Sequence, residues 1–342
     1  MDTRRINVIT GATGHIGVAL MYELKERGEY IRAIVRQGSG YDFIEPLADE
    51  IVYGDVTDGE SLEKAFDGAD IVYHLAGIIE IGKTDAKLIK AVNVDGTRKV
   101  AEAAKKAGIK RLVYVSSVHA IDFDTNDETI KEKDIFYPSK LKDDYSISKA
   151  EASNIVLDAV KNDGLNAVVL MPSGVTGPYA YRRSNIGQMI IEYANKRLAA
   201  YIDGEYDFVD VRDVARAMYA AADTDKIADG ECFLLSGHKL SVREMMLTLQ
   251  EITGVKASDI KLPLWVAKLF VPLAELLCKI KKIKPLYTKS SVEILNSNGN
   301  FDNSKAKETL GFAPMSAAQS LKDEYEFMLK IEPELFKKIP RK

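Results

Sequence analysis

The fold is decided by the stretch Asn7-Val8-Ile9-Thr10-Gly11-Ala12-Thr13-Gly14-His15-Ile16-Gly17. Its apolar first part predicts a short buried strand over residues 5–10, and apolar residues at helical spacing predict a helix that ends near residue 28. The glycines between them permit a tight turn, let backbone N–H groups approach a pyrophosphate, and allow the helix to pack closely on the strand. The helix amino end adds partial positive charge for an anion. Taken alone, the triplet fits either a dinucleotide-binding turn or an ordinary tight turn.

The chain continues as an alternation of apolar, β-branched runs with helical patterns. The runs lie at residues 30–35, 50–53, 71–75, 111–115 and 165–171, and the helical patterns at 61–66, 87–106, 145–162 and 184–195. This alternation predicts an α/β fold, a Rossmann-type doubly wound parallel sheet whose carboxyl edge binds the ligand.

Prolines and the loss of the repeating pattern after residue 171 predict a change in organisation there. We predict a dinucleotide-binding domain over residues 1–171, to which segments around residues 198–236 add strands. A smaller substrate lobe is predicted over residues 172–330, followed by a basic tail over residues 331–342. A charged run over residues 122–144 is predicted to be a solvated loop.

Composition narrows the class of protein. The 342 residues carry a formal net charge of −4 with 29% charged side chains, which gives no field that points to nucleic acid. The start of the chain lacks a signal peptide pattern, so a cytoplasmic location is expected. Cys232 and Cys278 form no C-x-x-C pair and are expected in the core, and the four histidines lack metal-ligand spacing, so no metal site is predicted.

Tyr145 and Lys149 are four residues apart on a predicted helix and therefore share one face of it. A free phenol titrates near ~10, which makes it a poor proton relay at neutral pH. A cation about 4 Å away, at an effective dielectric constant of about 20, is worth roughly 4 kcal/mol, or about three pKa units. We therefore expect Lys149 to depress the pKa of Tyr145, although an isolated Tyr-x-x-x-Lys also arises by chance on surface helices.

Several motifs that occur in order show a resemblance. The chain resembles the extended short-chain dehydrogenases/reductases in Gly11-Ala12-Thr13-Gly14-His15-Ile16-Gly17, Gly54-Asp55-Val56, His74-Leu75-Ala76-Gly77, Asn93-Val94-Asp95-Gly96-Thr97, Val115-Ser116-Ser117, Tyr145-x-x-x-Lys149 and Pro172-Ser173-Gly174-Val175-Thr176-Gly177-Pro178. Residues 208–217 and 305–312 resemble the C-terminal half of the same family, the NAD-dependent epimerase/dehydratase family. Within it, the chain looks most like the dihydroflavonol reductase and 3β-hydroxysteroid dehydrogenase branches.

The resemblance implies a catalytic set of Ser117, Tyr145 and Lys149. Tyr145 transfers the substrate proton, Lys149 holds the nicotinamide ribose and depresses the tyrosine, and Ser117 hydrogen-bonds the reacting oxygen. Ser116 is expected to be structural. Asn93 matches an asparagine that braces the site in this superfamily, and it also fits a helix cap.

The same resemblance implies a set of cofactor-binding residues in the glycine turn and at the strand ends. Besides Tyr145 and Lys149, they are Gly11, Thr13, Gly14, His15, Ile16, Gly17, Arg36, Asp55, Val56, Leu75, Ala76, Gly77, Asn93, Pro172, Ser173 and Val175. Arg36 ends the second predicted strand, where NAD enzymes usually place an acid for the ribose 2′-hydroxyl. An arginine there suits a 2′-phosphate, so NADP(H) is favoured over NAD(H), with a merely exposed arginine as the alternative.

By this resemblance, three functions compete. The favoured one is an NADP(H)-dependent reduction of a ketone or aldehyde, or oxidation of the alcohol, on a bulky apolar small molecule. The others are a nucleotide-sugar epimerase/dehydratase and a non-catalytic NADP-binding protein. Val118 and His119 follow Ser117 where sugar dehydratases carry an acidic pair, which disfavours that chemistry.

Candidate substrate contacts are His119, Tyr179, Tyr181, Met189 and Trp265. For His119 a solvated loop position is the alternative, and for the others core packing. The apolar stretch over residues 262–284 is interrupted by charges and a proline, so it is too broken to span a membrane. We expect it to wall the substrate pocket rather than to touch a membrane surface, and a homodimer is possible.

Overall fold

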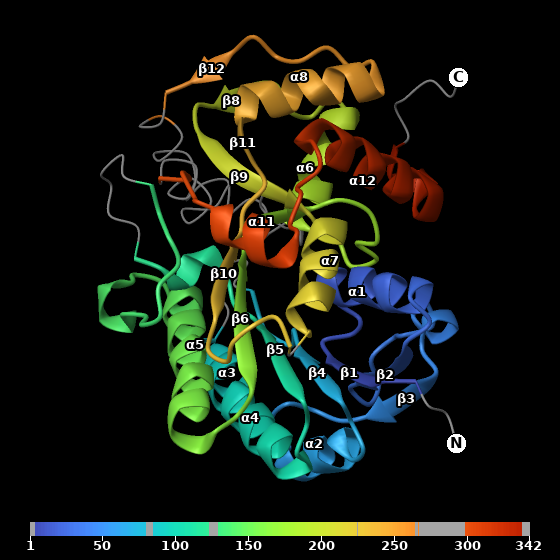
Figure 1. The fold of residues 1–342 in the computed structure, drawn as a ribbon. Helices are drawn as coiled ribbons and strands as arrows, with labels where there is room; N and C mark the ends of the chain where they lie inside the picture. The colour runs from blue at the N-terminus through green and yellow to red at the C-terminus, as the bar shows by residue number, and fades with distance from the viewer. Residues whose placement is uncertain are drawn as a thin grey trace.

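A seven-stranded parallel sheet forms the centre of the molecule (Figure 1). The computed structural model describes residues 4–79, 85–122, 129–223, 225–263, 266 and 298–336. The strand order is β10-β6-β5-β4-β1-β2-β3, which confirms the predicted Rossmann-type fold. The strands are β1 (Ile6–Thr10), β2 (Tyr30–Val35), β3 (Glu50–Tyr53), β4 (Ile71–His74), β5 (Arg111–Val115), β6 (Ala167–Pro172) and β10 (Cys232–Leu235).

Helices cover both faces of this sheet because successive side chains of each strand point to opposite faces. Ile9 packs among residues of one apolar core and its neighbour Val8 among residues of the other. The first core lies under α1 (His15–Glu26), α7 (Val211–Ala221) and α11 (Ser304–Leu310). The second lies under α2 (Gly59–Phe66), α4 (Gly96–Ala107) and α5 (Asp144–Asp163). Burial on both faces explains the continuous apolar runs in the sequence.

An upper layer stands on the carboxyl edge of the sheet (Figure 1). It contains α6 (Asn185–Ala194), α8 (Val242–Thr253), α12 (Ala317–Ile331), a sheet of β7 (Gly174–Thr176), β9 (Glu205–Asp210) and β11 (His238–Ser241), and the pair β8 (Tyr201–Ile202) and β12 (Lys261–Leu262). A third apolar core joins α6, α8, α12, β9 and β11. Strand β6 runs directly into β7, and β10 into β11, so the chain enters the upper layer more than once. The boundary proposed at residue 171 stays a prediction.

The helix predicted over residues 87–106 is interrupted in the structure. It consists of α3 (Ala86–Ile89), a π-helical turn (Lys90–Asp95) and α4. A π-helical turn adds a residue to the helical repeat and is often found at functional sites. Here it carries Asn93, whose side chain is buried.

The charged run over residues 122–144 is only partly a solvated loop. Glu132 accepts a hydrogen bond from the backbone N–H of Leu234 at 3.0 Å, on the open side of the edge strand β10. Ile130 forms a parallel bridge with Phe301 beside it. This segment therefore covers a sheet edge that would otherwise expose unpaired backbone groups, which corrects the expectation for its described part.

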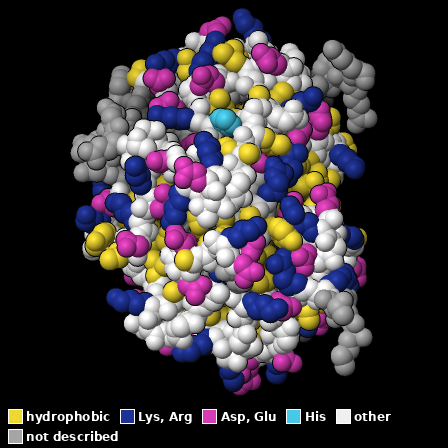
Figure 2. All heavy atoms as spheres, viewed as in Figure 1, with side chains coloured by type: hydrophobic (Ala, Val, Ile, Leu, Met, Phe, Trp, Pro, Cys, Tyr) yellow, Lys and Arg dark blue, Asp and Glu magenta, His cyan; other side chains and the backbone are white. Residues whose placement is uncertain are grey.

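Charges of both signs are mixed over the face in Figure 2, in keeping with the small net charge. Among the described residues, no helix is both long enough and apolar enough to cross a bilayer.

Candidate functional site

The glycine turn joins β1 to α1, and two of its glycines are required by their surroundings. Gly11 has a φ of +73°, and a Cβ there would lie 2.7 Å from the backbone nitrogen of Ala76. A Cβ on Gly17 would lie 2.9 Å from the Cα of Ala12. Gly14 is the N-cap residue of α1 and, in the described part of the chain, no side chain caps the helix. The first N–H groups of α1 therefore stay available for an anion.

His15 lies in this turn, but its imidazole is used for a contact between layers. Its Nε2 lies 2.7 Å from the carbonyl oxygen of Pro178 and 3.1 Å from that of Gly177. These bonds tie the start of α1 to the segment that follows β7. The backbone of His15 can still meet an anion, and the role of this residue in cofactor binding stays a prediction.

A buried chain of hydrogen bonds supports the ends of β1 and β4. His74 Nδ1 lies 2.8 Å from Thr10 Oγ1, and His74 Nε2 lies 2.9 Å from Thr97 Oγ1. Thr97 donates its proton to the carbonyl oxygen of Asn93 at 2.6 Å, so it accepts from Nε2 and leaves Nδ1 to accept from Thr10. Burial lowers the pKa of His74 to about 3, which keeps the ring neutral as this arrangement requires. His74 is thus a structural part of the site.

Asn93 links the loop after β4 to α5. Its Oδ1 accepts from the N–H of Ile78 at 2.7 Å, and its Nδ2 donates to the carbonyl oxygen of Ile78 at 3.0 Å and to Ser148 Oγ at 3.0 Å. These contacts fit the bracing role rather than the helix cap, because the residue lies inside a helical stretch. Ser148, which the sequence argument missed, sits between Tyr145 and Lys149 and bonds the carbonyl of Tyr145 at 2.7 Å.

Ser117, Tyr145 and Lys149 meet at the carboxyl end of β5. Ser117 follows this strand, and its side chain lies near enough to Tyr145 to lower the pKa of the phenol. Lys149 lies one turn further along α5, and its Nζ donates to the carbonyl oxygen of Val115 at 2.9 Å. A Cβ on Gly77 would lie 3.5 Å from this Nζ, so the backbone that follows β4 passes close to the ammonium. Ser116 instead pairs with Ser153 at 2.7 Å, in agreement with a structural role.

The pKa values of Tyr145 and Lys149 are shifted in a different way from that expected from the sequence. Burial raises the pKa of Tyr145 to about 12, although the neighbouring Ser117 side chain acts in the opposite direction. Burial also lowers the pKa of Lys149 to about 8. Removal from water disfavours the charged form of both groups, and this cost outweighs the attraction assumed from the sequence. The expected depression of the tyrosine is therefore absent from the described structure.

The residues expected around the adenosine part lie at the ends of β2 and β3. Arg36 directly follows β2, its side chain is exposed, and no ion pair of it is present among the described residues. Asp55 Oδ1 accepts from the backbone N–H and the hydroxyl of Thr57 at 2.8 and 2.7 Å. Val56 is buried against Gly96. Of these three residues, only Arg36 has an exposed charged side chain without an ion pair among the described residues.

The segment from Pro172 to Pro178 is held from above by α12. Glu324, which is fully buried, accepts from Thr176 Oγ1 at 2.6 Å, from the N–H of Gly177 at 3.2 Å and from Ser184 Oγ at 2.8 Å. Sequence reasoning missed Glu324, because no local sequence pattern indicates that a carboxylate on a helix pairs with a residue 148 positions earlier in the chain. Ser173 and Val175 lie within this segment, and Leu75 and Ala76 follow β4.

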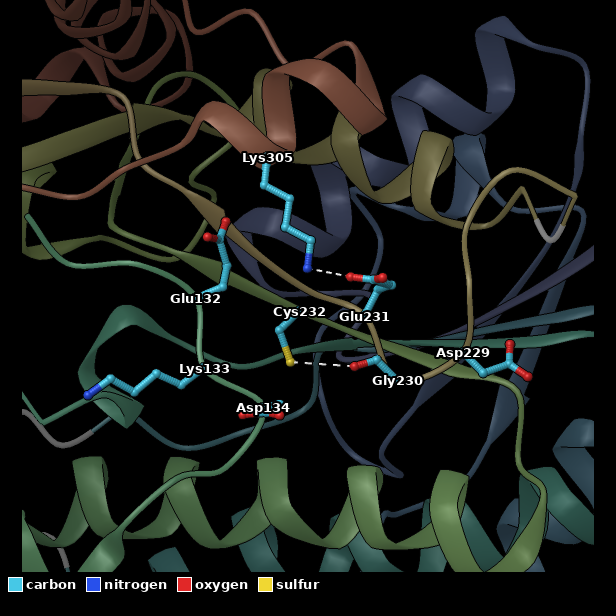
Figure 3. A pocket seen from close by; sticks show the side chains of 8 residues that line it. All are labelled: Glu132, Lys133, Asp134, Asp229, Gly230, Glu231, Cys232 and Lys305. Atoms are coloured by element: carbon cyan, nitrogen blue, oxygen red, sulfur yellow. Dashed lines mark hydrogen bonds and ion pairs between the residues drawn. The ribbon is translucent and has the colours of Figure 1, made fainter.

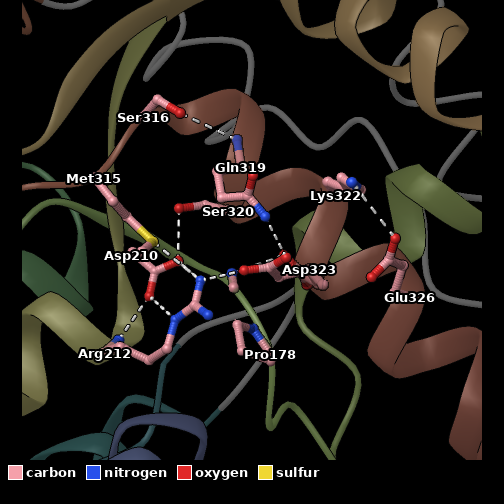
Figure 4. Close-up of polar contacts among 12 residues, drawn as sticks. Pro178, Asp210, Arg212, Met315, Ser316, Gln319, Ser320, Lys322, Asp323 and Glu326 are labelled. Atoms are coloured by element: carbon pink, nitrogen blue, oxygen red, sulfur yellow. Dashed lines mark hydrogen bonds and ion pairs between the residues drawn. The ribbon is translucent and has the colours of Figure 1, made fainter.

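A second network lies next to it (Figure 4). Arg212 donates a bidentate pair of hydrogen bonds to Asp210, each at 2.8 Å. It also donates to Asp323 of α12 at 2.6 Å. Burial opposes ionisation of Asp210, but the hydrogen bonds from Arg212 and Ser320 outweigh it and lower the pKa of this carboxyl. The C-terminal helix is thereby fixed to the end of β9.

The four predicted substrate contacts that the structure describes do not gather at one place. The ring of His119 packs edge-on against that of Tyr145, with centroids 6.3 Å apart. Tyr179 stacks on Tyr22 and Tyr181 on Phe43, at 4.3 and 4.5 Å, so both belong to an aromatic cluster beside α1.

Met189 packs against the apolar core of the upper layer. A contact of Tyr179, Tyr181 or Met189 with substrate stays a prediction, and their packing fits the core alternative. Trp265 and nearly all of the 262–284 stretch lie outside the described residues.

Tyr206 of β9 is a neighbour of the site that the sequence did not reveal. Its hydroxyl lies 2.8 Å from Nε2 of His119, and the two rings are nearly parallel, at 10°, with centroids 6.0 Å apart. Burial lowers the pKa of His119, with Asp143 acting in the opposite direction, and burial raises the pKa of Tyr206.

A cavity of about 300 Å³ lies apart from these residues, beside the edge strand β10 (Figure 3). It is lined by Glu132, Lys133, Asp134, Asp229, Gly230, Glu231, Cys232 and Lys305. Burial raises the pKa of the Cys232 thiol to about 12, so it stays protonated, as a core cysteine would. Cys278 lies outside the described residues, and within them no cluster of three metal-ligating side chains occurs.

Comparison with known proteins agrees with this architecture. The family model described as "NAD dependent epimerase/dehydratase family" matches residues 7–235. Sterol demethylase protein B of Methylococcus capsulatus is 32% identical over 321 residues, which cover 92% of this chain and 96% of that protein. A putative dihydroflavonol 4-reductase of Synechocystis sp. is 31% identical over 317 residues, 92% of each chain.

A solved structure shows the same fold over nearly the whole chain. The crystal structure of gox2253 is 29% identical, has a TM-score of 0.82, and matches 96% of this chain and 98% of that one. With the glycine turn, the motif order and the family match together, the chain belongs to the NAD-dependent epimerase/dehydratase family, the extended short-chain dehydrogenases/reductases.

Proposed function

We propose that this protein is an NADP(H)-dependent oxidoreductase that interconverts a carbonyl and an alcohol on a bulky apolar small molecule of the sterol or flavonoid type. The observation that carries the proposal is the meeting of Ser117, Tyr145 and Lys149 at the carboxyl end of β5, on the sheet edge where β1 runs into the glycine turn. The names of the two relatives, one for a sterol and one for a flavonoid, support a rigid polycyclic substrate.

The described residues fit a dinucleotide. The uncapped amino end of α1 suits the pyrophosphate, and the backbone at Gly77 lies close to Lys149. The exposed guanidinium of Arg36 at the end of β2 suits a 2′-phosphate, which supports NADP(H). When bound, the nicotinamide supplies or accepts the hydride.

Side chains of the protein then hold and transfer the proton that the substrate oxygen takes up. Because the pKa of Tyr145 is raised to about 12, its phenol holds the proton at neutral pH and is ready to give it to a developing alkoxide. The Ser117 hydroxyl lies beside that phenol and can donate to the same substrate oxygen. The ammonium of Lys149, with a pKa lowered to about 8, stabilises the phenolate that remains after transfer.

The alternative function is a nucleotide-sugar epimerase or dehydratase, which the family description includes. Dehydratase chemistry needs a further acid and base beside the catalytic serine. Here Val118 is fully buried, and burial lowers the pKa of His119. Val118 and His119 therefore do not supply the acid and base that elimination needs, which favours simple carbonyl reduction.

The test is a screen of hydroxysteroids, flavanonols and simple ketones with NADP(H) and NAD(H), read as the change in reduced-nicotinamide absorbance. On the substrate found, Tyr145→Phe should lower kcat by about 100- to 10,000-fold, as expected for loss of a general acid, with dinucleotide affinity nearly unchanged. Tyr137→Phe, which alters an exposed tyrosine, is the matched control. If Tyr145→Phe keeps more than a tenth of the activity, Tyr145 is not the proton donor. Conversion of a UDP-sugar in place of any ketone or alcohol would support the alternative.

A further inference from the structure

We propose that Tyr206 is a positioning residue for the proposed reaction and that it acts by holding the imidazole of His119 against the ring of Tyr145. The inference rests on the proposed function and adds to it a role for β9, a strand of the upper layer. It starts from a contact between residues 87 positions apart, the 2.8 Å hydrogen bond between the Tyr206 hydroxyl and His119 Nε2.

Proton counting assigns the direction of this bond. Burial raises the pKa of Tyr206 and lowers that of His119, so both side chains are neutral at neutral pH. A neutral phenol carries one proton, and among the described residues the hydrogen-bond partner of this hydroxyl is Nε2 of His119, to which the proton is assigned. The bond therefore places the ring proton of His119 on Nδ1 and fixes the tautomer as well as the orientation of the ring.

Tyr206 is itself held rigidly. It lies in β9 between β7 and β11, where it pairs with Leu240, and only 7% of it is exposed. The ring of Phe208 packs edge-on against it at 5.6 Å. A Cβ on Gly174 would lie 2.9 Å from Cε1 of Tyr206, so the glycine of β7 makes the space that this ring occupies.

His119, the partner of Tyr206, also contacts the proposed catalytic tyrosine, Tyr145. His119 lies in a short 3-10 turn (Val118–Ala120) whose amino end is capped by Ser117, which accepts from the N–H of His119 at 3.2 Å. Its ring meets that of Tyr145 edge-on, at 66°. A rigid strand, a fixed imidazole and the catalytic phenol thus form one contiguous stack.

Loss of the Tyr206 hydroxyl should act on the chemical step rather than on cofactor binding. Small misplacements of a reacting group cost up to about 100-fold in rate, and the glycine turn and Arg36 follow β1 and β2, away from β9. We expect Tyr206→Phe to lower kcat by about ten- to a hundredfold and to leave the dissociation constant of the dinucleotide within about twofold of the wild type.

Tyr193→Phe is a matched control. Its hydroxyl also makes one buried hydrogen bond in the upper layer, and its ring belongs to the same apolar core as that of Tyr206, but the partner is the carbonyl of Val255, at 2.6 Å, instead of His119. Both substitutions remove one phenol proton from a buried contact. Only Tyr206→Phe should change kcat, and a general loss of stability would affect both variants alike.

A double-mutant cycle of Tyr206→Phe and His119→Ala shows whether Tyr206 affects kcat through His119 or independently of it. If Tyr206 acts through His119, adding Tyr206→Phe to His119→Ala should lower kcat by less than about twofold more. In ¹H–¹⁵N spectra of the histidine rings, Tyr206→Phe should move the Nε2 signal of His119 among the four histidines, and Tyr193→Phe should not.

The outcomes separate this proposal from the proposed function. A wild-type protein that turns over no carbonyl or alcohol substrate overturns the function. An active wild type with an unaltered kcat in Tyr206→Phe, additive losses in the cycle or an unmoved His119 signal overturns the role of Tyr206 alone.

Discussion

Replacing Lys149 by methionine should make the protein more stable at neutral pH while removing its activity. Only 6% of Lys149 is exposed, and burial lowers its pKa from the ordinary 10.5 to about 8. At about 1.4 kcal/mol per pH unit, holding the ammonium in this site costs about 3 kcal/mol. Methionine has a similar length and no charge, so it avoids this cost.

The gain is partly offset by a lost hydrogen bond. The Nζ of Lys149 donates to the carbonyl of Val115, and leaving that carbonyl without its partner costs about 1–2 kcal/mol. At pH 7 we therefore expect Lys149→Met to be about 1–2 kcal/mol more stable than the wild type.

The dependence on pH is the sharper test. Because the folded-state pKa of Lys149 is lowered, the wild type regains stability as the pH rises from about 8 to 10.5, where the ammonium is lost in the folded protein before it is lost in the unfolded chain. The variant lacks this gain, so its advantage should fall by up to about 3 kcal/mol and change sign. Lys161→Met, on the exposed part of the same helix, should show no such dependence. Urea unfolding followed by circular dichroism at pH 7, 8.5 and 10 measures the difference, and a constant value across this range refutes the reasoning.

Three further predictions follow from the same structure. Arg36→Asp should invert a preference for NADPH over NADH by ten- to several-hundredfold in dissociation constants measured by titration, and equal affinities in the wild type would contradict it. Gly17→Ala should destabilise the fold by about 1–3 kcal/mol, because its Cβ would press on Ala12, whereas Gly59→Ala meets open space and should not. Glu324→Ala should lower the free energy of unfolding by about 3 kcal/mol or more, because two buried donors and one partly buried donor lose their acceptor, with a smaller loss in Glu324→Gln; a loss below about 1 kcal/mol would contradict this account.

The sequence by itself determined the central sheet and the place of the candidate site. Continuous apolar runs such as residues 111–115 become buried strands because both of their faces are covered, and this pattern is local. The carboxyl ends of parallel strands share one edge, so the glycine turn after β1 and Ser117 after β5 come to the same side. Tyr145 and Lys149 are related by one helical turn, which the sequence spacing specifies directly.

Only the tertiary structure decided the partners that are distant in the chain. Tyr206 faces His119 across 87 residues, and Glu324 meets Thr176 across 148, because the upper layer folds back onto the edge of the sheet. No local pattern specifies such a pairing. The pKa of Tyr145 is also a tertiary property, since it depends on how completely the surrounding elements remove the phenol from water. Sequence spacing places a cation near this tyrosine, but the cost of desolvation, which spacing does not reveal, decides the direction in which its pKa moves.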